Sequence, residues 1–304
     1  MPTFFHLMAA EGLKLRRSQV GRLVWLLPVL FVALEFLVFE VPTLGFKSMT
    51  PQFQAVLATR PASLVLALWV CFFHPLMLAL IPALLFRPEH RGKTWRHLYA
   101  MPVPRRGFYL AKAAWALMLC AGMLGLLGLL LLLEQRAVDS MNPILAHPVS
   151  GLRMLELFGW LWLGSLPVLA VYLWVSNRIN SLAVPVMFGL VGLLLTVALT
   201  GQELPQPWRR DLIPWVLPYA VTERVVHEGP AQQAAHAAGQ VFQPEADTIR
   251  LPSGRKVKTH QNVPPEALFP PPPPTPTWLL ALFSAAGGGL LLALGWLDAG
   301  RPRA

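Results

Sequence analysis

Charged residues are scarce in this sequence. Asp, Glu, Lys and Arg make up 13% of its 304 residues, whereas hydrophobic residues make up 55%. Soluble domains usually contain about 25% charged residues. The apolar residues also gather in long blocks instead of following amphipathic spacing. This composition excludes an ordinary soluble domain and predicts an integral membrane protein.

Cysteine is scarcer still. Cys71 and Cys120 are the only two, and both fall inside apolar blocks, where we interpret them as small buried hydrophobic residues. His90 and His97 lie seven residues apart, which on a helix is about 10 Å, too far to share an ion directly. No HExxH motif supports them. We therefore predict no bound metal.

A nucleotide-binding motif is missing too. Gly92-Lys93-Thr94 resembles the end of a phosphate-binding P-loop, but Arg87 stands where that motif needs its first glycine. The preceding segment is an apolar block rather than a strand. No catalytic triad and no paired carboxylates at helical spacing can be assembled from the sequence. We therefore expect no catalytic site in this chain, and ATP, if it is used, must bind to a partner.

The basic residues that are present give a formal net charge of +10. They lie beside the ends of apolar blocks and do not form one basic face with interleaved aromatic residues, as nucleic-acid-binding surfaces do. This placement predicts contact with anionic membrane lipid and no nucleic-acid partner.

Six apolar stretches are long enough to cross a bilayer, which needs roughly 20 residues of helix. The predicted fold class is therefore an all-α integral membrane protein with six transmembrane helices. The stretches are Leu23–Val41, Ser63–Phe86, Tyr109–Leu133, Met154–Val175, Leu182–Thr200 and Trp278–Leu297.

The distribution of Lys and Arg predicts the orientation of these helices. Cytoplasmic loops carry an excess of basic residues, and the connections on the side of the N-terminus are the richer ones here. We therefore expect both termini in the cytoplasm. Because basic residues precede a block too long for a signal peptide, the first stretch is expected to stay as an anchor. The short loops on the other side hold only Lys47, Arg60, Arg136 and Arg153.

The remaining segments divide the chain further. Residues 1–22 predict an amphipathic helix on the inner surface, because apolar side chains alternate with Lys14, Arg16 and Arg17. Residues 23–200 hold the first five spans, with a cytoplasmic connection at 87–108, and residues 278–304 hold the sixth span and a tail.

Residues 201–277 form a long extracytoplasmic region between the fifth and sixth spans. Its apolar, aromatic first part, 208–226, predicts a short hairpin that dips into the outer leaflet. The rest, 229–277, predicts a mobile, proline-rich insertion. Within it, Thr248–Thr259 alternates around Pro252-Ser253-Gly254 as a β-hairpin does.

Two polar residues, Glu35 and His74, lie inside predicted spans. Such residues are costly in lipid and are candidates for function. Two structural interpretations stay open: Glu35 faces water near the outer leaflet, and His74 bonds a neighbouring helix. Glycines in the third and sixth spans, at 122, 125, 128 and 287–289, predict close helix packing.

The N-terminus and the connection between spans two and three together resemble a known family. The segments that carry the likeness are EGLKLRRS at 11–18, EHRGKTW at 89–95, MPVPR at 101–105 and YLAK at 109–112. They resemble the permease subunits of bacterial type-2 ATP-binding-cassette (ABC) exporters, including lantibiotic-immunity and bacitracin-resistance permeases.

This resemblance implies a role in ATP-driven export of an amphipathic peptide, lipid or drug-like molecule across the bacterial inner membrane. It implies that a separate ABC ATPase binds ATP and Mg²⁺, and that a second permease copy or a paralogue completes the pathway. The surface helix, with Glu11, Lys14, Arg16 and Arg17, and a coupling helix at Gly92–Tyr99 would contact the ATPase. The implied coupling residues are Glu89, Arg91, Thr94, Trp95, Arg96, Leu98 and Tyr99.

Two other functions remain open from the sequence. A membrane scaffold or sensor could use the long outer region to bind a partner. An intramembrane enzyme could use Glu35 or His74, although the lack of a catalytic constellation argues against it.

Overall fold

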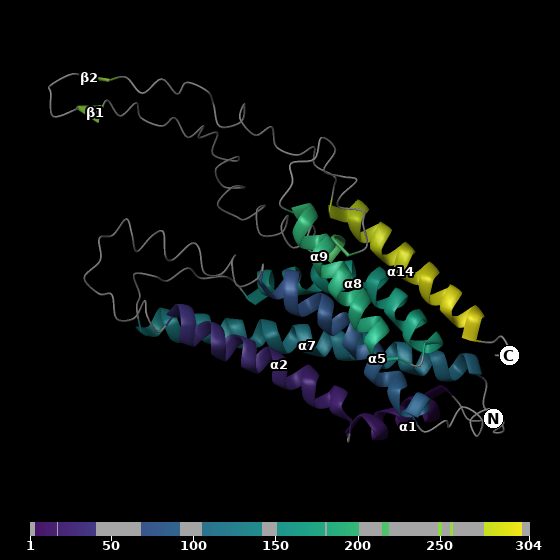
Figure 1. Ribbon diagram of the computed structural model, residues 1–304. Coiled ribbons are helices and arrows are strands. Elements are labelled where there is room, and N and C mark those ends of the chain that lie inside the picture. Colours follow the sequence, from purple (N-terminus) through teal and green to yellow (C-terminus); the bar gives the residue numbers. More distant parts are fainter. Residues whose placement is uncertain are drawn as a thin grey trace.

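The chain forms a bundle of long helices in the computed structural model (Figure 1), which describes residues 4–16, 18–40, 68–91, 105–141, 151–179, 181–200, 215–218, 249–250, 256–257 and 277–299. Almost all of these residues are helical, so the predicted all-α class is confirmed. The helices are α1 (Phe4–Arg16), α2 (Gln19–Glu35), η1 (Phe36–Glu40), η2 (Trp69–Phe73), α5 (His74–Arg91), α7 (Arg105–Met141), α8 (Gly151–Arg178), α9 (Ala183–Thr200) and α14 (Thr277–Ala299).

Within the described part of the chain, five helical segments are long and apolar enough to cross a membrane. The sixth predicted span corresponds to α9, whose apolar part, Ala183–Leu199, is shorter. Its crossing of the bilayer therefore stays a prediction, as does the orientation. The five segments are Gln19–Val38, Trp69–Arg91, Arg106–Val138, Met154–Arg178 and Leu280–Ala299.

The helices end at places that the apolar blocks alone do not define. The surface helix α1 stops at Arg16, short of the predicted boundary at residue 22, because Ser18 interrupts it and begins α2. The Ser18 hydroxyl donates to the carbonyl of Leu15 and accepts from the backbone N–H of Gly21, as an N-cap residue does. The connection predicted at 87–108 is shorter as well, because α5 continues to Arg91 and α7 already begins at Arg105.

Helix α5 lies at the centre of the bundle. It packs against α2, α7, α8 and α9. In its most apolar stretch 78% of the residues are buried, whereas in that of α14, at the edge of the bundle, 22% are. Both free cysteines are buried, as expected. Two of the predicted packing glycines allow close helix contact: a Cβ at Gly128 of α7 would lie 2.8 Å from Phe158 of α8, and one at Gly288 of α14 would lie 2.8 Å from Leu166 of α8. Gly125 and Gly289 have open space around them, so the prediction is wrong for these two.

The two chain ends of the bundle lie together. Helix α1 and the C-terminal part of α14 lie toward the same end of the bundle (Figure 1). There, the guanidinium of Arg106 at the start of α7 lies over the ring of Trp296, 4.6 Å from its centroid. This is the end that the sequence predicts to be cytoplasmic. The predicted β-hairpin is present as two short antiparallel strands, β1 (Ile249–Arg250) and β2 (Lys256–Val257).

Candidate functional site

Helix α1 is fixed to the start of α7 by a tryptophan. The indole N–H of Trp115 donates to the carbonyl of Met8 at 2.9 Å. The same ring lies against Gly12, where a Cβ would come within 2.7 Å of it. A side chain at position 12 would therefore push α1 away from α7. This contact turns one face of the surface helix toward the bundle.

Four charged side chains meet on that face, and we call them the charge cluster: Glu11, Lys14, Glu89 and Lys112. Glu11 and Lys14 are one turn apart on α1, Glu89 lies in the last turn of α5, and Lys112 lies near the start of α7. The ammonium of Lys112 lies 2.8 Å from Glu11 Oε2 and 3.1 Å from Glu89 Oε2. The ammonium of Lys14 lies 2.5 Å from Glu11 Oε1 and 3.2 Å from Glu89 Oε1.

Three members of the charge cluster are buried. The side chains of Lys112, Glu89 and Glu11 are 1%, 3% and 4% exposed, whereas that of Lys14 is 48% exposed. Lys112 also donates to the carbonyl of Leu85 at 2.6 Å and lies over the rings of Phe86 and Phe108, at 5.3 and 4.9 Å. Buried charges need such partners, because an unpaired one is strongly destabilising. The charges of two carboxylates and two ammonium groups cancel, so the cluster connects α1, α5 and α7 without a net charge.

Lys14 stands at the open side of the charge cluster. Burial alone would lower the pKa of Lys14, but its hydrogen bonds to Glu11 and Glu89 and their charges raise that pKa above its usual 10.5. Lys14 therefore stays charged at physiological pH. About half of the Lys14 side chain remains exposed, which leaves room for the expected contact with lipid head groups. That contact stays a prediction.

The structure thus brings together three of the predicted site residues, Glu11, Lys14 and Glu89. Arg16 and Arg91 are exposed at the ends of α1 and α5. Lys112 belongs to the YLAK segment of the resemblance, but the sequence analysis does not predict it as a site residue. The feature that could have indicated its role is a lone lysine inside an apolar block, which needs acidic partners from elsewhere in the chain. The predicted residues that lie outside the described part of the chain are Arg17, Thr94, Trp95, Arg96, Leu98 and Tyr99.

Further polar contacts close the same end of the bundle. The guanidinium of Arg178 on α8 forms an ion pair with Asp298 on α14, and the indole of Trp174 donates to the same carboxylate at 3.2 Å. His90 on α5 lies 2.9 Å from the carbonyl of Ser176 on α8. Helices α5, α8 and α14 are therefore joined by polar contacts beside the charge cluster.

His74 serves to join two helices. It is fully buried at the start of α5, and its Nε2 lies 2.6 Å from the hydroxyl of Ser165 on α8. Because the one hydroxyl hydrogen of Ser165 is donated to the carbonyl of Leu161 at 2.6 Å, Nε2–H of His74 donates the hydrogen bond to the Ser165 oxygen. Of the two interpretations of His74, the bond to a neighbouring helix is the one that the structure shows.

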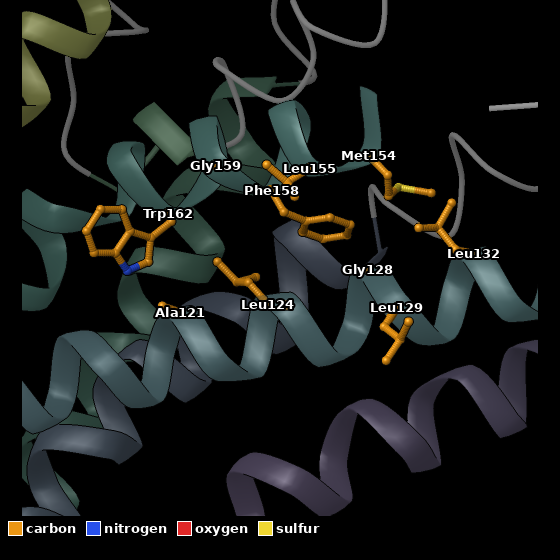
Figure 2. A pocket seen from close by; sticks show the side chains of 11 residues that line it. Ala121, Leu124, Gly128, Leu129, Leu132, Met154, Leu155, Phe158, Gly159 and Trp162 are labelled. Carbon is orange, nitrogen blue, oxygen red and sulfur yellow. The ribbon is translucent and has the colours of Figure 1, made fainter. Parts of the chain in front are cut away.

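An apolar groove lies between α7 and α8, away from the charge cluster. Its volume is about 440 Å³, and Figure 2 shows Phe158 lying over Gly128, with Trp162 at one end and Leu132 and Met154 at the other. Apolar atoms make up nearly all of its surface, so it can accept an acyl chain or another apolar group. The full lining is Ala121, Leu124, Gly125, Gly128, Leu129, Leu132, Met154, Leu155, Phe158, Gly159 and Trp162.

The part of the chain that the structure describes contains no group of three His, Cys, Asp or Glu side chains that could hold a metal ion.

The family model described as ABC-2 family transporter protein matches residues 7–195. That stretch includes all four members of the charge cluster and the groove between α7 and α8. A comparison with curated proteins finds no match.

Proposed function

The chain belongs to the ABC-2 transporter family, and from this premise we propose that this multi-pass membrane component is the permease of an exporter driven by a separate ATPase. The observation that carries the proposal is the charge cluster. It joins the surface helix to the two helices, α5 and α7, that flank the connection 92–104.

The proposed ATPase contacts are α1 and this connection. A force on either would be transmitted to α5 and α7 through Glu89 and Lys112. If α1 moved alone, it would separate buried ion pairs, which is strongly destabilising. Side chains that must stay paired move as one body. The charge cluster would therefore convert closure of two ATPase subunits into tilting of two spans, with ATP and Mg²⁺ bound by the ATPase.

The groove between α7 and α8 supports an amphipathic substrate. It is lined by apolar side chains and lies toward the ends of these helices that are predicted to face outward. An acyl chain or a hydrophobic peptide side chain fits this chemistry, whereas a small ion does not. We place the transporter in the bacterial inner membrane, paired with a second copy or a paralogue.

The described residues of the predicted outer hairpin support a closed outer side. Trp215 donates from its indole to the hydroxyl of Tyr172 on α8 at 3.0 Å, and Thr196 on α9 donates to the carbonyl of Trp215 at 3.0 Å. Val216 and Leu217 are buried. Export would require this segment to leave its place between α8 and α9.

Transport in inverted membrane vesicles tests the proposal. Vesicles that contain this chain and its ATPase should take up a fluorescent amphiphile only when ATP is added, because their cytoplasmic face points outward. Vesicles with an ATPase variant that cannot hydrolyse ATP are the control. Uptake that is independent of ATP, or ATP-driven loss from preloaded vesicles, would contradict export; no ATP-dependent movement of any amphiphile would favour a scaffold or sensor.

A further inference from the structure

A buried carboxyl group lies at the other end of the bundle from the charge cluster. Glu35, in the last turn of α2, is 7% exposed, and its Oε2 makes no hydrogen bond within the described chain. Most of the Glu35 side chain is thus shielded from solvent, and its contact with water near the outer leaflet stays a prediction. A carboxylate at this depth is costly unless a partner of opposite charge is present. Among the described residues, the Oε2 atom of Glu35 is thus a buried acceptor that lacks such a partner.

A buried donor and an aromatic cluster lie beside it. Phe31 precedes Glu35 by one helical turn, and its ring lies 5.0 Å from that of Trp69 and 5.1 Å from that of Phe73. Trp69 is fully buried, and its indole N–H also has no hydrogen-bond partner in the described residues. Within the described residues, one polar atom without a partner thus belongs to the aromatic cluster, and the other lies one helical turn from Phe31 in the sequence.

The backbone is irregular at the same place on both helices. The π-helix η1 begins directly after Glu35, and the π-helix η2 begins with Trp69. Segments of π-helix are rare and are frequently found at functional sites. Neither the apolar groove between α7 and α8 nor the charge cluster shares a residue with this region.

We propose that Glu35, Phe31, Trp69 and Phe73 form a binding site for the positively charged group of an amphiphile. The carboxylate supplies the opposite charge, the aromatic rings attract cations through their faces, and the Trp69 N–H binds an acceptor next to the cation. The site names a substrate class for the proposed exporter, and only its role in transport rests on that function. The cation is either the head group of a lipid or part of a free amphiphile.

Binding of tetraphenylphosphonium to the purified chain in a non-ionic detergent tests the site without any ATPase. Saturable binding is expected, and tetraphenylborate, an anion of the same shape, should not compete. Glu35→Gln should weaken binding on the order of tenfold or more, because it removes the buried charge but keeps the shape. Phe73→Leu, which removes one ring, should weaken it about threefold.

The matched control is Glu156→Gln, which removes an exposed carboxylate at the same predicted side of the membrane. It should bind like the wild type. Competition by added phosphatidylethanolamine, but not by phosphatidylglycerol, would support the site with a lipid ammonium as its ligand; no competition by either would support it with a free amphiphile. No saturable binding to the wild type, or equal binding by Glu35→Gln, overturns the site and leaves the ATP-driven transport test unaffected.

Discussion

At the scale of single residues, the charge cluster holds α1, α5 and α7 together through two carboxylates and two lysines. The resemblance indicated Glu11, Lys14 and Glu89, but as contacts to an ATPase rather than to one another. Their pairing depends on Lys112, which is separated from Glu11 by 101 residues in the sequence. Such a partnership is tertiary, and no spacing rule within one helix predicts it. The sequence marks Glu35 as a polar residue inside a span, but it does not show that the Trp69 ring packs on Phe31, one helical turn away, for the same reason.

Replacing Lys112 by Met is expected to destabilise the protein more than replacing Lys14. The first change leaves two buried carboxylates with one half-exposed lysine and should lower the free energy of unfolding by about 3–5 kcal/mol. Lys14→Met removes a half-exposed partner and should cost about 1 kcal/mol or less. Thermal unfolding in detergent measures both, with Arg136→Met, an exposed site on α7, as the control. Equal melting temperatures for the two lysine variants would show that the cluster does not hold α1 in place.

At the scale of elements, long apolar blocks predicted the existence of every spanning helix that the structure describes. They did not predict the ends, since these depend on caps and on distant partners. Ser18 divides α1 from α2 through its own hydrogen bonds. Glu89 can remain helical at the end of α5 because two lysines from other helices neutralise it. A hydropathy pattern contains neither kind of information.

Substitution of Gly192 tests how the Trp215 segment packs on α9. A Cβ at Gly192 would collide with the Trp215 ring, whereas a Cβ at Gly159 of α8 would meet open space. Gly192→Ala should therefore destabilise the protein by about 1–3 kcal/mol through overpacking. Gly159→Ala gains the same helix propensity without a clash and should be neutral or stabilising by up to about 1 kcal/mol. Melting temperatures compare the two; a stabilised Gly192→Ala would mean that Trp215 does not occupy this place.

At the scale of the whole molecule, one continuous helix connects the two ends of the bundle. It begins with Trp69 in η2, beside the proposed cation site, and ends near Glu89 in α5, within the charge cluster. Because this helix is central and most of it is buried, we expect a shift at one end to move side chains that pack along it. Substrate binding and ATPase contact would thus act on the same rigid element.

Co-purification of the ATPase is the most direct test of the central claim, that this permease works through an ATPase held at α1 and the connection 92–104. The chain is expressed together with a P-loop ATPase of the ABC type and isolated from detergent extracts. The wild type and Arg136→Glu, which changes the opposite predicted side, should recover the ATPase in equal amounts. Trp95→Ala, and the double variant Arg91→Glu with Arg96→Glu, should recover at least about tenfold less ATPase at unchanged membrane levels of the chain. These changes remove an aromatic side chain and two basic side chains that are expected to contact the ATPase. Recovery equal to the wild type in both variants, or no ATPase with the wild type, would contradict the claim.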